Sequence, residues 1–281
     1  MTRVDPWVSG KQTHRRLSDA VATGRQDYAA TRPGTAAYLR AETAMLDRLT
    51  LALDRRQLAL DLGCGSGRVT MRLASRFAEV RGYDMSARML ERAAGERGSA
   101  EHVRLVRRDL DERLLDDVPD GAADLVVAAF GMVSFLRDPV RLLTELDRVL
   151  APAGRALLSF YNARSLVAAL TPTGLHPVGL GAVAGPQPDL LEVEYDGDEY
   201  HVPARAYLSD EVRALCSPMF RCELRSFPTV SGWLSDDAAT DTQAICGAVD
   251  DALGGRGGPL VGSYLVASLS RPRRLRLALS P

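Results

Sequence analysis

The stretch Leu58–Gly67, which reads Leu-Ala-Leu-Asp-Leu-Gly-Cys-Gly-Ser-Gly, constrains the fold more than any other part of the chain. Leu58–Leu62 is a short apolar run, typical of a strand buried on both faces of a parallel sheet. Glycines follow at alternate positions, and glycine permits a tight, partly left-handed turn that lets a ligand approach the backbone. Arg68–Ala78 then has apolar residues at helical spacing. This order of strand, glycine loop and helix predicts a nucleotide or cofactor site at the carboxyl end of a sheet.

The glycine spacing disfavours two common nucleotide sites. The dinucleotide fingerprint Gly-x-Gly-x-x-Gly/Ala fails, because Arg68 and Thr70 stand where its third small residue would be. A phosphate-binding loop requires a lysine after its last glycine, and the only lysine of the chain is Lys11. A tight turn without a ligand remains the alternative interpretation of this loop.

The segment resembles motif I of the class I S-adenosylmethionine-dependent methyltransferases, Asp-x-Gly-x-Gly-x-Gly, which is matched by Asp61, Gly63, Gly65 and Gly67. The resemblance implies S-adenosyl-L-methionine as the cofactor, held by this loop together with Cys64. It also implies an α/β fold with a doubly wound, seven-stranded and mostly parallel sheet in the order 3-2-1-4-5-7-6. An N-terminal helical lid and an inserted cap, made of a loop and a hairpin, are expected beside this sheet.

The next strand is expected to place an acid at the cofactor's ribose. Glu79–Tyr83 reads as the second strand, and Asp84 follows 17 residues after Gly67, near the interval at which an acid receives a ribose in doubly wound folds. The resemblance implies that role for Asp84, with Met85 beside it. Asp84 or Ser86 could also cap the helix expected over 86–98, and both roles are compatible.

The third and fourth strands are expected to complete the site. Val103–Arg107 reads as the third strand, and the resemblance implies that Asp109 and Leu110, which follow it, contact the adenine. A helix cap or a solvated charge is the alternative for Asp109. Ala123–Phe130 reads as the fourth strand, and its end, at Phe130, should lie beside the sulfonium.

The remaining elements follow from the apolar spacing. We expect helices over Val140–Leu150, 208–216 and Ser235–Leu253, a break at Ala151–Arg155, and strands over Ala156–Tyr161, Arg221–Phe227 and Leu260–Leu269. The last two strands would form the antiparallel pair at one edge of the sheet.

The expected organisation has five parts: an N-terminal lid (1–57), a core that binds the cofactor (58–162), a substrate cap (163–207), a C-terminal part of the core (208–270) and a tail (271–281). In the lid, helices are predicted over Leu17–Ala30 and Thr35–Leu53, with Tyr28 and Arg32 as candidates for lining the cofactor. In the cap, a stretch rich in proline and glycine precedes two strands, Leu190–Tyr195 and Glu199–Tyr207, joined by a hairpin turn. The cap is expected to set specificity.

No catalytic base stands out in the sequence. Methyl transfer from a sulfonium mainly requires alignment and exclusion of water, and it needs a base only if the nucleophile carries a proton. Tyr161 and Asn162, at the end of the fifth strand, and His176 and His201, in the cap, are the candidate catalytic residues. Packing and capping are the alternatives for the first two, and a solvated or structural role is the alternative for each histidine. His14 is expected at the surface.

The charge, the apolar runs and the cysteines of the chain exclude several classes of binding partner. The formal net charge of −1 gives no overall field that would recruit nucleic acid, and no apolar run approaches the roughly 20 residues of a membrane span. The first residues lack the apolar core of a secretory signal. The four cysteines show no zinc spacing, and no metal site is expected. We therefore expect a cytoplasmic protein that acts on a small molecule, as a monomer or a homodimer, without nucleic acid or membrane as a partner.

These observations predict methyl transfer from S-adenosyl-L-methionine to an oxygen, nitrogen or carbon atom of a small molecule. We expect an in-line displacement without a metal ion and a role in secondary metabolism. Two alternatives stay open. One is a member of the fold that binds the cofactor without methylating, in a cyclase or structural role. The other is a nicotinamide-dependent oxidoreductase, which Arg68 disfavours.

Overall fold

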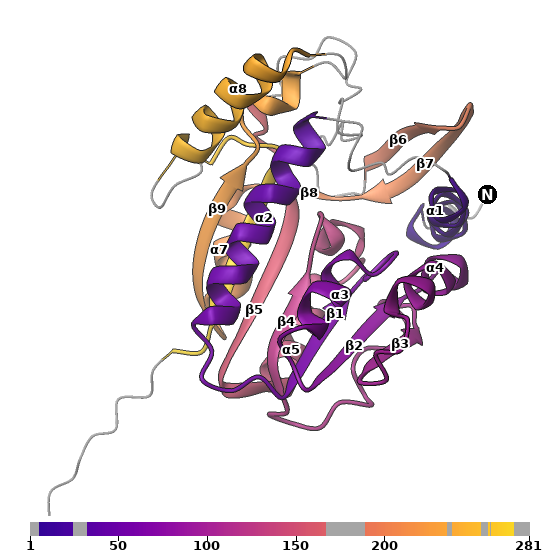
Figure 1. Ribbon diagram of the computed structural model, residues 1–281, viewed down its shortest axis with the longest axis vertical. Coiled ribbons are helices and arrows are strands. Elements are labelled where there is room, and N and C mark those ends of the chain that lie inside the picture. Colours follow the sequence, from indigo (N-terminus) through magenta and orange to yellow (C-terminus); the bar gives the residue numbers. More distant parts are fainter. Residues whose placement is uncertain are drawn as a thin grey trace, which may run out of the picture.

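A central twisted sheet organises the molecule (Figure 1). The computed structural model describes residues 6–24, 33–166, 189–234, 238–253, 258 and 260–272. The sheet runs in the order β3-β2-β1-β4-β5-β10-β9, which confirms the predicted order. Its strands are β1 (Leu58–Leu62), β2 (Glu79–Asp84), β3 (Val103–Arg107), β4 (Ala123–Ala128), β5 (Leu150–Asn162), β9 (Arg221–Phe227) and β10 (Tyr264–Ser270). The first five are parallel to one another, and β10 is antiparallel to both β5 and β9.

Helices cover both faces of the sheet, as a doubly wound fold requires. On one face lie α2 (Pro33–Leu51), α3 (Arg68–Ala74) and α4 (Ala87–Arg97), and on the other lie α5 (Pro139–Val149) and α7 (Ser209–Cys216). The alternation within β1 explains the arrangement, because Leu58, Leu60 and Leu62 join the core under α5 and α7 while Ala59 joins the core under α2 and α3. Asp61 therefore points toward the α3 face. A further helix, α8 (Thr240–Leu253), packs against α2.

The helix α1 (Pro6–Thr23) packs between α4 and a hairpin formed by β6 (Asp189–Tyr195) and β7 (Asp198–Ala204) (Figure 1). The approach is close: a Cβ added to Gly10 would lie 2.2 Å from Cδ of Pro203. The hairpin turn is Asp196-Gly197, with φ values of 54° and 81°, as the tight turns that match strand twist require. A segment near the N-terminus and a segment after the fifth strand therefore form one layer.

Several element boundaries differ from those expected. The first helix runs from Pro6 to Thr23, so it begins well before the predicted span Leu17–Ala30. Residues 25–32, which include Tyr28 and Arg32, lie outside the described residues. The predicted break at Ala151–Arg155 belongs to β5, where it forms a bulge: Ala123 pairs with Leu150, and the next pair is Leu125 with Arg155.

The end of the hairpin also differs. The expected strand over 199–207 is divided, because the Arg205 amide donates to the Ser134 carbonyl (2.8 Å) instead of continuing the hairpin. The chain then forms β8 (Ala206–Tyr207), which pairs in parallel with the end of β5 as an eighth, unexpected strand. This connection ties the cap to the core at Tyr161 and Asn162.

Candidate functional site

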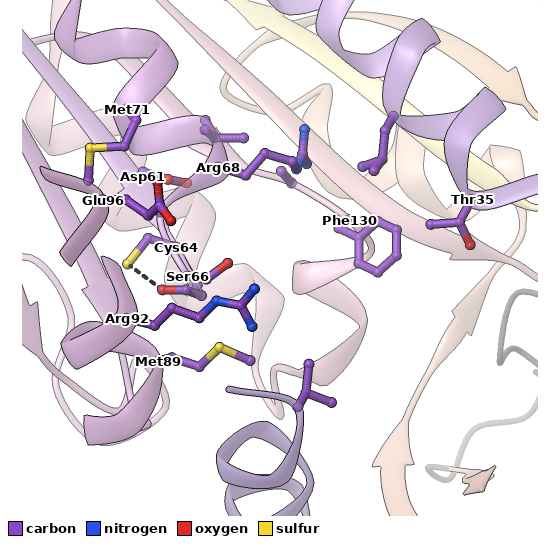
Figure 2. A pocket seen from close by; sticks show the side chains of 17 residues that line it. Thr35, Asp61, Cys64, Ser66, Arg68, Met71, Met89, Arg92, Glu96 and Phe130 are labelled. Atoms are coloured by element: carbon purple, nitrogen blue, oxygen red, sulfur yellow. Dashed lines mark hydrogen bonds between the residues drawn. The ribbon is translucent and has the colours of Figure 1, made fainter. Parts of the chain in front are cut away.

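Two cavities meet at the carboxyl ends of the parallel strands. The loop cavity, of about 500 Å³, lies between the glycine loop, α2 and α4 (Figure 2). The helix cavity, of about 230 Å³, lies between the ends of β2, β3 and β4 and the helix α1. Both are lined by Gly63, Gly65, Met89, Ala129 and Phe130, so they form one continuous site. This is the edge at which open α/β sheets bind ligands.

The glycine loop is tied to the end of β2. The amides of Gly63 and Cys64 donate to the Tyr83 carbonyl at 2.8 and 2.9 Å, and the Gly65 amide donates to Asp84 Oδ2 at 2.8 Å. Gly63, Gly65 and Gly67 all have positive φ. A Cβ on Gly65 would meet nothing closer than Met89 Sδ, at 4.0 Å, so the space in front of this residue is open to a ligand.

Asp61, near the end of β1, and Cys64, in the glycine loop, both line the loop cavity. Asp61 is buried, and its Oδ2 accepts a hydrogen bond from the Thr70 hydroxyl at 2.6 Å. Burial raises the pKa of Asp61 to about 6, although the Thr70 hydrogen bond opposes the shift. Burial also raises the pKa of the Cys64 thiol, which therefore stays protonated. The loop cavity thus has a carboxylate but no thiolate.

Asp84 lies at the end of β2 and lines the helix cavity with Met85. One oxygen of Asp84 accepts the Gly65 amide, and the other accepts the Ser86 amide at 2.8 Å. Burial raises the pKa of this carboxyl, and the backbone hydrogen bonds oppose the shift. A carboxylate oxygen accepts about two hydrogen bonds, so each retains capacity for a ligand hydroxyl.

Asp109 lines the helix cavity, beside the buried Leu110. Its Oδ1 accepts from the Lys11 ammonium at 2.9 Å and from the Asp111 amide at 3.0 Å. Its Oδ2 is buried and forms an ion pair with the same ammonium, also at 2.9 Å. Lys11 therefore holds both oxygens of Asp109 against α1.

A strained turn lies where the two cavities meet. Phe130 has a φ of 54°, a left-handed conformation that is unfavourable for a residue with a side chain. Its amide donates to Glu42 Oε1 at 2.9 Å and to the Tyr38 hydroxyl at 3.1 Å. Glu42 also binds the Arg68 guanidinium at 2.6 Å, and Figure 2 shows Arg68 and Phe130 on the wall of the loop cavity. Burial raises the pKa of Tyr38, so its hydroxyl remains protonated.

The helix α1 contributes three residues that the sequence analysis did not select. Lys11, His14 and Ser18 lie on one face of α1 and line the helix cavity. The His14 ring lies 4.4 Å from the ring of Phe135, and burial lowers the pKa of His14 to about 4, with Asp109 opposing. The prediction that His14 is a surface residue holds only in part, because its side chain is partly exposed and its ring packs on Phe135. The spacing of Lys11, His14 and Ser18 indicates that they share one face of a helix, but nothing in the sequence placed this helix over the site.

The expected cofactor residues all line one or both cavities: Asp61, Gly63, Cys64, Gly65, Gly67, Asp84, Met85, Asp109, Leu110 and Phe130. They come from the ends of four neighbouring strands. In the described ranges, no group of three or more histidine, cysteine, aspartate or glutamate side chains could hold a metal ion.

The expected catalytic residues are not brought together. Tyr161 is buried among aromatic rings, 5.3 Å from Phe135 between ring centres. Asn162 is buried, and its amide group donates to two carbonyls, those of Leu260 (3.1 Å) and Gly262 (2.7 Å). His201 is exposed on β7, and none of these three lines either cavity. His176 lies outside the described residues.

Comparison with known proteins identifies the core. Residues 60–158 match the family model of the methyltransferase domain. The chain is 34% identical over 102 residues to the malonyl-[acyl-carrier protein] O-methyltransferase of Hahella chejuensis, a match that covers 36% of this chain and 35% of that protein. It is 40% identical over 94 residues to the trans-aconitate 2-methyltransferase of Streptomyces coelicolor, covering 32% of this chain and 30% of that protein. The matches span between 30% and 51% of the curated relatives' own length.

Solved structures show the same fold over most of the chain. The complex of DhpI with SAH has a TM-score of 0.56 at 17% identity and covers 94% of this chain and 97% of that one. An S-adenosylmethionine-dependent methyltransferase from Mesorhizobium loti has a TM-score of 0.53 at 19% identity, covering 84% and 98%. Residues 60–158 therefore match the methyltransferase domain, and the chain has the Rossmann-like fold of these solved structures.

Proposed function

We propose that this protein transfers the methyl group of S-adenosyl-L-methionine to a small-molecule acceptor. The observation that carries the proposal is the joined pair of cavities, in which Asp61, Asp84 and Asp109 stand at the ends of three neighbouring strands around an open glycine loop. The cofactor supplies a methyl group already activated by positive sulfur.

The residues present fit the parts of this cofactor. The Asp109 carboxylate would receive the adenine amino group, and Leu110 would lie against the ring. The remaining acceptor capacity of Asp84 suits the ribose hydroxyls. The open space before Gly65 would receive the methionyl chain, and Phe130 would lie near the sulfur.

In this arrangement the protein's task is alignment and exclusion of water. The clamped turn at Phe130 fixes one wall of the site, and α1 covers the helix cavity. His14 is the one histidine of the described residues on the walls of these two cavities, and a pKa of about 4 matches it poorly to proton abstraction near pH 7. We therefore assign His14 to packing and assign no base to the reaction.

The acceptor would be selected by the cap, residues 163–207. The curated relatives are named for acceptors as different as malonyl-[acyl-carrier protein], trans-aconitate and phosphatidylethanolamine, so they support methyl transfer without narrowing the acceptor. A role in secondary metabolism and a cytoplasmic location are part of the same proposal. None of the helices in the described ranges combines the length and apolar character that crossing a membrane requires.

Calorimetry with S-adenosylhomocysteine and NAD tests the cofactor assignment, and transfer of labelled methyl groups from the cofactor into a metabolite extract tests the reaction. We expect S-adenosylhomocysteine to bind and NAD not to bind, with label appearing in a small molecule. Failure to bind S-adenosylhomocysteine would refute the proposal. Tight binding without transfer to any acceptor would favour the non-methylating alternative.

A further inference from the structure

Glu42, on α2, is a buried carboxylate that connects two segments of the loop cavity's wall. Its side chain is 2% exposed and does not itself line the cavity. Its Oε2 accepts from the Arg68 guanidinium at 2.6 Å, and its Oε1 accepts from the Phe130 amide at 2.9 Å. Arg68 begins α3 directly after the glycine loop, Phe130 lies two residues beyond β4, and both line the loop cavity. One carboxylate therefore ties the glycine loop to the turn after β4.

The turn after β4 depends on such ties. Phe130 and Gly131 are two successive left-handed residues, with φ values of 54° and 73°. The Phe130 amide donates to Glu42 and to the Tyr38 hydroxyl, and the Gly131 amide donates to Ser159 Oγ at 2.9 Å. The Tyr38 hydroxyl lies 2.7 Å from Ser159 Oγ, which closes the cluster. A left-handed residue with a side chain persists only where its surroundings hold it, so the cluster sets the position of Phe130.

This cluster belongs to one part of the joined site. The loop cavity is the part assigned to the methionyl chain, whereas Asp84 and Asp109 stand at the part assigned to the adenosine. Among the described residues, no hydrogen bond or ion pair joins either of these aspartates to Glu42, Arg68 or Phe130. Breaking the tie should therefore change the fit of the methionyl chain much more than the fit of the adenosine.

We propose that Glu42 is a positioning residue for the methionyl end of the cofactor, which it provides by fixing the Phe130 turn relative to the glycine loop. The inference rests on the proposed function, because it assumes that the loop cavity receives the methionyl chain. It acts through a neutralised and buried ion pair, so its effect is one of geometry held in advance of binding.

The test compares two ligands by calorimetry: S-adenosylhomocysteine and 5′-methylthioadenosine, which has the same adenosine and sulfur but lacks the amino acid end. Glu42→Gln keeps the size of the side chain but turns an amide toward a guanidinium that can only donate, so the tie to Arg68 is lost. We expect this variant to bind S-adenosylhomocysteine about tenfold more weakly and 5′-methylthioadenosine at most about twofold more weakly.

Two further variants make the comparison specific. Tyr38→Phe keeps the ring and the ion pair of Glu42 but removes one acceptor of the Phe130 amide, and it should show a smaller loss, about threefold, for S-adenosylhomocysteine alone. Asp47→Asn is the matched control, because Asp47 also joins α2 to α3, through Arg72, but lies outside both cavities. It should bind both ligands like the wild type. Circular dichroism and thermal unfolding establish that each variant is folded.

The outcomes separate this inference from the proposed function. If the wild type does not bind S-adenosylhomocysteine, the proposed function is wrong and this inference with it. If the wild type binds but folded Glu42→Gln keeps both affinities, or loses both equally, only the inference is overturned. An equal loss would show a merely structural role, and so would a selective loss in Asp47→Asn. Should Glu42→Gln fail to fold, Tyr38→Phe decides, and unchanged or equally reduced affinities in it overturn the inference.

Discussion

At the scale of single residues, Gly65 gives the sharpest test of the glycine loop. Gly65→Ala adds a methyl group that the protein itself can accommodate but that enters the space assigned to the methionyl chain. We expect S-adenosylhomocysteine binding to weaken at least tenfold. Gly121→Ala is the matched control, because Gly121 also has positive φ (64°), has open space and lines neither cavity. Both variants should lose about 1 kcal/mol of stability from backbone strain. Equal affinity for the ligand in both would contradict the assignment.

Asp84 should contribute through the ribose. A hydrogen bond to a charged acceptor contributes roughly 1.5–3 kcal/mol, so Asp84→Ala should weaken cofactor binding at least tenfold. Because Asp84 also anchors the amides of Gly65 and Ser86, part of the loss would come from the loop. A 2′-deoxy analogue of the cofactor separates the two effects. The wild type should bind this analogue more weakly than it binds the parent cofactor, whereas Asp84→Ala should bind the two ligands almost equally. Equal losses in both proteins would argue against a direct contact.

His14 should make stability depend on pH in a definite direction. Its pKa is about 4 in the folded protein, against 6.5 for a free imidazole, so the unfolded chain binds more protons between these values. The wild type should therefore lose stability as the pH falls from 7 to 5. His14→Phe keeps a ring against Phe135 and should remove this loss, about 2 kcal/mol of unfolding free energy over that interval. Urea unfolding of both proteins at pH 7 and pH 5 measures this change in unfolding free energy. An equal loss in the wild type and in His14→Phe would contradict the role assigned to His14.

The sequence could identify the residues that belong to one continuous motif or that follow a strand at a fixed interval. The glycines and Asp61 stand in one stretch, and Asp84 and Asp109 each follow a strand at a predictable interval. Lys11 and Glu42 could not be found in the same way, because each acts through a contact with a segment far along the chain: Asp109 for Lys11, and Arg68 and Phe130 for Glu42. No spacing rule links such pairs in a single sequence.

At the scale of elements, α1 is the part whose movement can be followed most directly. A protease that cleaves only after lysine has one target in this chain, at Lys11 within α1. Cleavage requires local opening of the helix, and a ligand that binds only the closed form suppresses opening. With S-adenosylhomocysteine at 100 times its Kd, we expect cleavage to slow by up to about 100-fold.

The control for this experiment is a peptide with the sequence of α1, whose cleavage should be unaffected by the ligand. An unchanged rate of cleavage in the intact protein would mean that the cofactor site does not depend on α1. Asp19 offers a second check, because its carboxylate accepts from the Ser86 hydroxyl at 2.6 Å and so joins α1 to α4. Asp19→Ala should therefore speed cleavage without ligand.

The core elements were predictable because strands buried on both faces and amphipathic helices leave strong periodic patterns. Helix α5 illustrates this, with Leu142, Leu143 and Leu146 buried on one side. The bounds of α1 were not predictable, because this helix is mostly polar. It packs on a hairpin almost two hundred positions away in the sequence, through Gly10 and Pro203. The short strand β8 was missed for a related reason: only the contact between Arg205 and Ser134 divides it from the hairpin.

At the scale of the whole molecule, the packing of α1 on the hairpin changes what removal of the cap should do. We expect replacement of residues 171–202 by a short Gly/Ser linker to abolish methyl transfer to the native acceptor, as a specificity cap requires. Because the linker would also remove β6 and most of β7, α1 should lose its support and cofactor binding should weaken several-fold. Calorimetry with S-adenosylhomocysteine and a transfer assay measure the two effects. Normal turnover by the folded variant would contradict the role of the cap.

The contact between Gly10 and Pro203 also bears on the order in which the protein matures as it is synthesised. The first five strands of the sheet end at Asn162, so their hydrophobic core can assemble while the hairpin is still inside the ribosome. The helix α1 leaves the ribosome first, yet the surface on which it docks is made late. A nascent chain therefore has its glycine loop before it has the wall that carries Lys11, and the helix cavity is complete only after translation has passed the cap.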